Sequence, residues 1–133
     1  MKSPAFLIDT DWVIDHFNGI THVTRRLKEL QPQGLGLSVV SSAELWEGVY
    51  FSRDPKHSQE TLEGFLLGVD VLGLDEEICK RFGQLRGSMR KRGQTIGDFD
   101  LLIAATALRH NLKLLTNNRK HFEGIAGLEI ESR

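Results

Sequence analysis

The sequence lacks the features that would direct it to a membrane, an oxidising compartment or a cysteine-rich zinc site. Its single cysteine, Cys79, cannot form an internal disulfide or a cysteine-rich zinc site. It contains no run of about 18 hydrophobic residues, the length that a membrane-spanning helix needs. The N-terminal stretch "MKSPAFLID" reaches an aspartate too soon to hold the hydrophobic region of a secretory signal. These absences predict a cytoplasmic protein that does not enter the membrane.

The composition predicts an ordinary globular domain. The 133 residues are 40% hydrophobic and 26% charged, which is typical of a folded chain. This length suits one domain with a real core, and no linker, repeat or low-complexity segment divides it. We therefore expect a single domain over residues 1–133.

The formal net charge of −1 does not indicate a nucleic-acid-binding protein, but the charges are unevenly placed. Between Ile78 and Gly97 there are six basic residues and no acidic one. Two more basic residues follow near the C-terminus. The candidates for binding RNA phosphates are Lys80, Arg81, Arg86, Arg90, Lys91, Arg92, Arg119 and Lys120. A solvent-facing helix surface explains the same pattern equally well.

Predicted strands and helices alternate along almost the whole chain. Short hydrophobic runs predict strands at 5–9, 34–40, 69–74, 112–116 and 128–131. Helical spacing and helix start and stop signals predict helices at 11–17, 21–31, 41–51, 56–67, 75–93 and 98–108. This alternation indicates an α/β fold with a central, mainly parallel sheet of four to five strands and helices on both faces.

The stretch "TIGDFDLLIAATAL", at 95–108, places two aspartates directly before a hydrophobic run. Hydrophobic residues fall on all faces of the predicted helix, so we expect the helix to be buried. Asp98 suits the N-cap position, where a carboxylate accepts hydrogen bonds from backbone N–H groups; a supporting role in a site is the alternative. Asp100 lies inside the first turn, and burying its charge without a partner would cost several kcal/mol. We therefore expect Asp100 to have a partner from elsewhere in the chain.

Acidic and amide side chains follow the ends of the predicted strands. Asp9 ends the first strand, Glu44 follows the second, and Asn117 and Asn118 follow the fourth. In open α/β sheets the ligand-binding crevice lies at the carboxyl ends of the strands. We therefore expect these side chains to meet Asp100 at that edge.

Most of these residues also have a purely structural interpretation. Glu44 completes an S-x-x-E capping box, and paired asparagines suit a turn. Asp11 and Asp15 are expected on a helix surface. Asp9 has the weakest structural interpretation, because Thr10 is available to cap the following helix.

Convergence of Asp9, Glu44 and Asp100 would require a compensating positive charge. Two carboxylates about 5 Å apart repel by roughly 3 kcal/mol at an effective dielectric of about 20. Three such pairs approach about 10 kcal/mol, which is comparable with the stability of a whole domain. Ligands that are all oxygen, with no Cys or His, favour a hard cation. The pattern thus predicts a site for Mg²⁺ or Mn²⁺.

Four stretches of the sequence resemble the PIN-domain ribonucleases, in particular the VapC toxins of bacterial toxin–antitoxin pairs. They are "FLIDTDWVID", "SVVSSAELWEGV", "IGDFDLLIAATAL" and "LLTNNRKHF", which follow the family's order from one end of the chain to the other. The resemblance implies a PIN-like three-layer α/β/α sandwich. It also implies a metal-dependent endoribonuclease that hydrolyses RNA phosphodiester bonds with a metal-activated water, leaving a 5′-phosphate and a 3′-hydroxyl.

The resemblance assigns roles to individual residues. It implies that Asp9, Glu44 and Asp100 form the catalytic acidic site and bind Mg²⁺ or Mn²⁺, with Asp9 and Asp100 as direct ligands and Glu44 placed to orient or deprotonate the water. Many relatives carry a fourth acid where this chain has Asn118, so a second metal ion is expected to bind weakly or not at all. The expected supporting residues are Thr116, Asn117, Asn118 and Asp98.

The resemblance further implies protein partners. VapC-type toxins are held inactive by a cognate VapB-like antitoxin, whose tail fills the groove over the active site, and they usually form homodimers. Two predicted helices carry more hydrophobic residues than one core needs. At least half of these residues are expected in the core and the rest at a dimer or antitoxin surface: Trp46, Val49, Tyr50, Phe51, Phe65, Leu66 and Leu67.

Three other classes of protein share some of these sequence features. A phosphatase of the haloacid dehalogenase type would use "DTDWV" as its nucleophile motif, but its strand-end hydroxyl should precede the late acids, whereas Thr116 follows them. A histidine-based ribonuclease needs paired imidazoles, and the five histidines show no shared placement at strand ends. A non-catalytic module is the remaining alternative. A phosphoacceptor receiver needs an aspartate at the end of a middle strand, where "LGLSVVSS" offers serines, and an RNA-binding PIN scaffold that has lost activity would be expected to lack one of the three acids.

Overall fold

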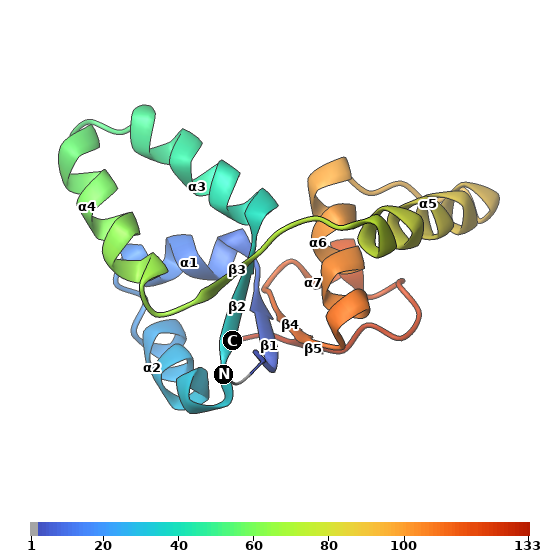
Figure 1. Cartoon of the computed structure of the whole chain (residues 1–133), viewed down its shortest axis with the longest axis horizontal. Coiled ribbons are helices and arrows are strands. Elements are labelled where there is room, and N and C mark those ends of the chain that lie inside the picture. The colour runs from blue at the N-terminus through green and yellow to red at the C-terminus, as the bar shows by residue number, and fades with distance from the viewer. Residues whose placement is uncertain (1–2) are drawn as a thin grey trace.

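Five short strands alternate with helices through residues 3–133, the range that this computed structural model describes (Figure 1). In chain order the elements are β1 (Phe6–Ile8), α1 (Thr10–Phe17), α2 (Thr21–Leu30), the 3₁₀ helix η1 (Gln31–Gln33), β2 (Leu35–Ser38), α3 (Val39–Tyr50), α4 (Pro55–Leu66), β3 (Asp70–Leu72), α5 (Glu76–Lys91), α6 (Asp98–His110), β4 (Lys113–Leu115), α7 (Arg119–Phe122) and β5 (Ile130–Glu131). Every predicted strand forms. The short helices η1 and α7 are additions that the sequence pattern does not predict.

The strands form one sheet in the order β3-β2-β1-β4-β5, and each adjacent pair is parallel. The predicted α/β class and mainly parallel sheet are therefore confirmed. In the register at the sheet centre, Ile8 is aligned with Leu37 of β2 and with Leu115 of β4. The next residues, Asp9 and Thr116, consequently leave the sheet side by side at its carboxyl edge.

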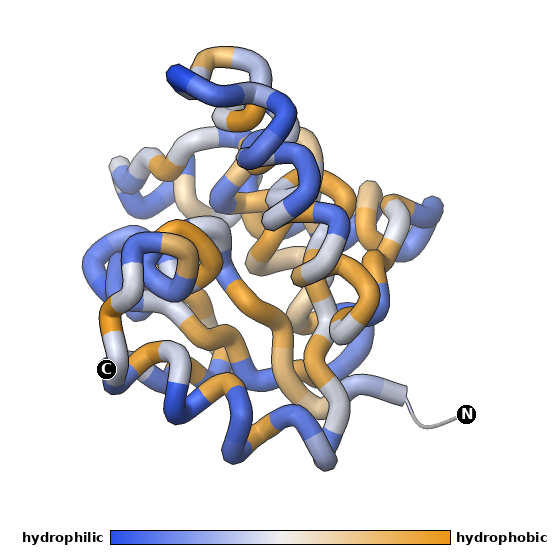
Figure 2. Tube along the Cα trace, turned by 90° about the vertical axis from the view of Figure 1, so that its left-hand side faces the viewer, coloured by the Kyte–Doolittle hydropathy of each residue, from blue (hydrophilic) through white to orange (hydrophobic). Residues whose placement is uncertain are grey.

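Alternate strand residues face opposite sides of the sheet and build two hydrophobic cores. In β1, Phe6 and Ile8 belong to the core that includes residues of α1, α2, α3 and α4, whereas Leu7 belongs to the core that includes residues of α5, α6 and α7. Figure 1 shows these two groups of helices on opposite sides of the strands. Figure 2 shows hydrophobic residues concentrated in the interior segments and hydrophilic ones on the outer turns. The predicted three-layer α/β/α sandwich is thus confirmed.

Helix α6 is buried, as its uniformly hydrophobic sequence predicts. Its fully buried residues are Leu101, Ile103, Ala104, Ala105, Thr106 and Ala107. Because α6 precedes β4, its chain runs back across the sheet, and its first turn lies near the carboxyl edge from which Asp9 emerges. Among residues 3–133, no helix is both long and hydrophobic enough to cross a bilayer.

Candidate active site

Asp9 occupies the junction between β1 and α1 and is only 2% exposed. Its backbone N–H donates to the carbonyl oxygen of Leu115 at 2.9 Å, which extends the pairing of β1 with β4. Its carboxylate is held at both oxygens: Oδ1 accepts from the backbone N–H of Thr10 at 2.8 Å, and Oδ2 accepts from the hydroxyl of Thr116 at 2.7 Å. The prediction that Thr10 caps α1 was wrong, because Asp9 itself is the N-cap.

The electrostatic environment of Asp9 favours its protonated form. Burial is the largest cause, and the negative charges of Asp11 and Asp100 act in the same direction, so that the pKa of Asp9 rises from 3.8 to about 7. The hydrogen bonds from Thr116 and Thr10 act in the opposite direction and moderate the rise. A buried carboxyl group beside other carboxylates is a suitable place for either a proton or a cation.

Glu44 is linked to Asp9 through the intervening Thr10. The hydroxyl of Thr10 donates to Oε1 of Glu44 at 2.9 Å. The predicted capping box is absent, because α3 begins at Val39 and its N-cap is Ser38, whose hydroxyl accepts from Val40 N–H at 3.1 Å. The earlier start places Glu44 in the second turn of α3, where a carboxylate has no capping role.

Asp100 lies in the first turn of α6 with its side chain 26% exposed. Its Oδ2 is 2.7 Å from Nδ1 of His121, which lies in α7. The sequence analysis missed His121, because a single histidine in a short, unpredicted helix gives no local signal. The expected partner for Asp100 is therefore present, in the form of an imidazole.

Asp98 does not cap α6, so that prediction was wrong. The N-cap is Gly97, and the Asp98 side chain is 78% exposed. Its Oδ1 accepts from a guanidinium nitrogen of Arg86 at 2.6 Å, which joins α6 to α5. The carboxylate still lies in the first turn of a helix, where negative charge is favourable.

The turn after β4 carries three of the expected supporting residues. Thr116 is fully buried; besides donating to Asp9, its hydroxyl accepts from Asn118 N–H at 3.0 Å. The side-chain oxygen of Asn117 accepts from Trp12 Nε1 at 3.1 Å and from Arg133 N–H at 2.8 Å. Since a carbonyl oxygen has two lone pairs, these two hydrogen bonds use both of them. The Asn117 side chain therefore stabilises the turn.

Asp11 was expected on a helix surface, and that expectation was wrong. Its Oδ2 accepts from Asn117 N–H at 2.9 Å, across the edge of the sheet. Its other oxygen, Oδ1, is buried and has no hydrogen bond of standard geometry among residues 3–133, although the carboxylate also interacts with the backbone N–H of Trp12 and with the carboxyl group of Asp9. Burial raises the pKa of Asp11, against the hydrogen bonds that its carboxylate accepts, and Asp11 also repels Asp9. Asp11 is thus a fourth acid at this edge.

The acids gather at one edge of the sheet without forming a closed set of ligands. Within residues 3–133, no three His, Cys, Asp or Glu side chains lie close enough together to hold one ion. Asp9 and Asp100 interact electrostatically, whereas Glu44 and Asp100 each contact a donor of their own, Thr10 and His121. The donor set is all oxygen and includes an unpaired buried carboxylate atom, which fits a hard divalent cation.

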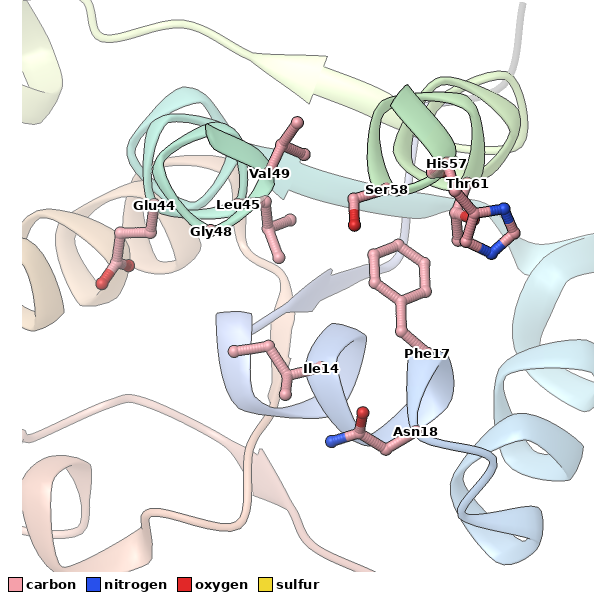
Figure 3. Close-up of a pocket in the computed structure, with 10 residues that line it drawn as sticks. All are labelled: Ile14, Phe17, Asn18, Glu44, Leu45, Gly48, Val49, His57, Ser58 and Thr61. Carbon is pink, nitrogen blue, oxygen red and sulfur yellow. The ribbon is translucent and has the colours of Figure 1, made fainter. Parts of the chain in front are cut away.

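A groove opens beside the acids, between α1 on one side and α3 and α4 on the other (Figure 3). Its volume is about 300 Å³. Hydrophobic side chains such as Ile14, Phe17 and Leu45 form its walls, and Glu44 lies at the end opposite His57 in Figure 3. Glu44 therefore belongs to both the acidic edge and the groove.

The candidate RNA-binding residues lie mainly on α5 and α7 and are exposed, with the exception of Arg86. The Arg86 side chain is 16% exposed, and it also donates to the Ile96 carbonyl oxygen at 2.8 Å. Arg86 is therefore engaged within the protein. Lys80 pairs with Glu77 at 3.4 Å on the α5 surface.

Three comparisons with known proteins agree with one another. A family model for the PIN domain matches residues 6–128. Ribonuclease VapC1 of Methanocaldococcus jannaschii is 37% identical over 132 residues, covering 97% of this chain and 88% of that protein. The tRNA(fMet)-specific endonuclease VapC of Shigella flexneri is 31% identical over 126 residues, with coverage of 95% and 96%. A chain in the crystal structure of VapBC2 from Rickettsia felis, bound to a DNA fragment from their promoter, matches with a TM-score of 0.91 at 28% identity, over 96% of this chain and 98% of that one.

Proposed function

The chain belongs to the PIN-domain family, and we propose that it hydrolyses RNA with Asp9, Glu44 and Asp100 arranged around a divalent cation, Mg²⁺ or Mn²⁺. It is a VapC-type toxin of a VapBC toxin–antitoxin pair and an RNA-cleaving hydrolase. The match over residues 6–128 supports the proposal that residues 1–133 form one nuclease domain. A haloacid dehalogenase-type phosphatase has no comparable support.

One observation carries the proposed site: Asp9 is a buried carboxyl group on which two further acids act. Its pKa rises to about 7 through burial, with the charges of Asp11 and Asp100 adding to the rise. A fold that retains such a group loses stability near neutral pH unless a cation compensates the charge. A divalent cation is the compensating group that PIN-family membership implies.

The chain's own residues place the acids for this chemistry. Thr116 and the backbone of Thr10 hold both oxygens of Asp9, so that this carboxylate is oriented in advance. Glu44, held by the Thr10 hydroxyl, would orient the attacking water or accept its proton. When bound, the cation would supply Lewis-acid chemistry, lowering the pKa of a water and stabilising charge on the phosphate. Cleavage of the P–O3′ bond leaves a 5′-phosphate and a 3′-hydroxyl.

The exposed basic residues would bind the RNA backbone. Arg90, Lys91 and Arg92 close α5 and the turn after it, and Arg119 and Lys120 begin α7, the helix that carries His121. Cationic side chains neutralise phosphates without reading the base sequence. We include these residues in the substrate surface and leave Arg86 out because of its internal contacts.

The VapB-like antitoxin would bind the groove between α1, α3 and α4. Hydrophobic walls with a carboxylate at one end suit an extended or helical segment that carries a basic residue (Figure 3). A homodimer would use the hydrophobic residues that the core leaves free: Tyr50 is 67% exposed, Phe51 85% and Leu67 91%. Trp46, Val49, Phe65 and Leu66, by contrast, belong to the core or pack against it. We place the protein in the cytoplasm, with its RNA substrate.

Cleavage of RNA under metal control tests the proposal. The full chain, purified free of its antitoxin, would be incubated with mixed cellular RNA in Mg²⁺, in Mn²⁺ and in EDTA. We expect cleavage that requires metal, leaves 5′-phosphate ends and is lost in Asp100→Asn. Asp98→Asn is the matched control, because it removes a carboxylate two residues away that, within residues 3–133, accepts from Arg86 and not from a residue of the acidic site. Cleavage that persists in EDTA, or in Asp100→Asn, would contradict the mechanism; metal binding without cleavage would favour a non-catalytic RNA-binding scaffold.

A further inference from the structure

The two carboxylate oxygens of Asp11 have different surroundings. Oδ2 accepts a 2.9 Å hydrogen bond from Asn117 N–H. Oδ1 is buried and has no hydrogen bond of standard geometry within residues 3–133. The Asp11 carboxylate does interact with the carboxyl group of Asp9, and the two can share a hydrogen bond when one of them is protonated. A buried polar atom without a partner costs free energy, and the cost is larger when the group is charged. The roles proposed for Asp9, Glu44 and Asp100 do not involve this oxygen.

Asp11 is held against Asp9. It lies two residues further along, in the first turn of α1, and it repels Asp9 more strongly than Asp100 does. Its anchor, Asn117, follows Thr116, whose hydroxyl donates to Asp9. Asp11 therefore faces Asp9 from the side on which β4 ends.

The turn directly after β4 offers no acid beside Asp9. Residues 116–118 are Thr-Asn-Asn. The side-chain oxygen of Asn117 is fully used by Trp12 Nε1 and Arg133 N–H. The unpaired carboxylate oxygen on this side is thus contributed by α1.

We propose that Asp11 is a direct ligand of the divalent cation, through Oδ1, and supplies the carboxylate that the turn after β4 lacks. This assignment rests on the proposed function, since it concerns the same cation. Two simpler roles compete with it. Asp11 could serve only as the anchor of Asn117, or only as a first-turn carboxylate that stabilises α1. Neither role explains why the carboxyl group of Asp11 is buried close to that of Asp9, where the two groups need a shared proton or a cation.

Binding of Mn²⁺ to the full chain, followed by electron paramagnetic resonance and by calorimetry in the absence of RNA, separates these roles. Asp11→Asn keeps an oxygen that can accept from Asn117 N–H but removes the charge. We expect it to raise the Mn²⁺ dissociation constant at least about tenfold, the lower end of the typical loss for residues that only support a ligand. Asp15→Asn, which removes a charge four residues along the same helix, should change the constant less than about twofold.

Thermal unfolding of the metal-free proteins controls for a structural loss. If Asp11→Asn does not fold, Asp11→Ser offers a second neutral side chain that can accept from Asn117, and the same tenfold loss is expected. Wild-type affinity in a folded neutral variant overturns the assignment of Asp11 and leaves the proposed function standing. If instead the wild-type chain binds no Mn²⁺, or binds it equally well as Asp100→Asn, both proposals fall.

Discussion

The hydroxyl of Thr116 donates a 2.7 Å hydrogen bond to Oδ2 of Asp9 and thereby joins the carboxyl ends of β4 and β1. The same hydroxyl accepts from Asn118 N–H. One side chain thus orients a buried carboxylate and shapes the turn beside it. The turn, the carboxylate and the strand pairing therefore form a single unit.

Replacing Thr116 by valine should impair both stability and activity. Thr116→Val keeps the shape of the side chain but leaves Asp9 Oδ2 and Asn118 N–H without their partner, which costs about 1–3 kcal/mol of unfolding free energy. We expect RNA cleavage to fall by about tenfold or more. The control is Thr106→Val, since Thr106 is equally buried but its hydroxyl donates to the Leu102 carbonyl oxygen within its own helix. Equal losses in both variants would show that Thr116 has no special role.

The contribution of Asp9 to the stability of the metal-free protein should decline between about pH 4 and pH 7. The folded state keeps the proton of Asp9 up to about pH 7, whereas the unfolded state loses it near 3.8. The folded state therefore binds more protons in this range, and its stability falls as pH rises, by at most about 1.4 kcal/mol per pH unit. Urea unfolding measured across this range should show a steeper decline in wild type than in Asp9→Asn. A parallel pair of profiles would contradict the raised pKa.

Removing the imidazole beside Asp100 should weaken metal binding without unfolding the protein. His121 and Asp100 are partly exposed, at 55% and 26%, so their contact contributes less than about 1 kcal/mol to stability. We expect His121→Ala to lower Mn²⁺ affinity by about tenfold while the melting temperature changes little. His110→Ala, at the other end of α6, is the control and should bind Mn²⁺ normally. Unchanged affinity in His121→Ala would mean that the contact does not position Asp100.

The ion pair between α2 and β5 should stabilise the fold above about pH 5. Arg26 Nε and Nη2 donate to the two carboxylate oxygens of Glu131 at 2.6 and 3.0 Å. The hydrogen bonds from Arg26 are the largest cause of the lowered pKa of Glu131, so the stabilisation is present above 4.5 and is lost as pH falls further. Arg26→Gln should cost about 1–3 kcal/mol at pH 7. Its exposed neighbour Arg25, as Arg25→Gln, should cost less than about 0.5 kcal/mol.

Neutralising the end of α5 should weaken RNA binding mainly at low salt. The triple variant Arg90→Gln, Lys91→Gln and Arg92→Gln removes three exposed charges. When log binding constant is plotted against log salt concentration for single-stranded RNA, each charge that binds a phosphate contributes about 0.7 to the slope. Binding titrations with catalytically inactive Asp100→Asn as background should show a slope reduced by up to about 2. Arg25→Gln with Lys28→Gln, on α2, is the matched control. An unchanged slope would identify the α5 charges as ordinary solvated residues.

The sequence predicted the strands and the buried helix α6 well, because these depend on local hydrophobic patterns. The helix starts were harder to predict. Ser38 and Gly97 are the N-caps of α3 and α6, whereas the residue pattern favoured Ser41 and Asp98. For α6 the difference has a tertiary cause, since Asp98 is paired with Arg86 of α5. A cap prediction from local sequence cannot include a cation supplied by another helix.

For the candidate site, the sequence indicated the correct edge of the sheet but not every participant. Asp9 and Asp100 could be singled out because one ends a strand and the other begins a buried helix. Asp11 and His121 could not be, because their contacts join segments far apart in the chain: Asp11 reaches Asn117 and His121 reaches Asp100. A carboxylate in a first helical turn and a single histidine are ordinary surface features until the register of the sheet is known.

The position of β5 bears on when the site can form during synthesis. Thr116 N–H donates to the Glu131 carbonyl oxygen, and Arg133 N–H donates to the Asn117 side chain. A nascent chain exposes β1, β2 and Asp9 long before Thr116, Asn117 and β5 have left the ribosome. Thr116, which donates to Asp9 Oδ2, thus follows Asp9 by 107 residues. A stalled or prematurely ended chain would carry the acids without the turn that orients them, so nuclease activity should appear only once translation has passed β5.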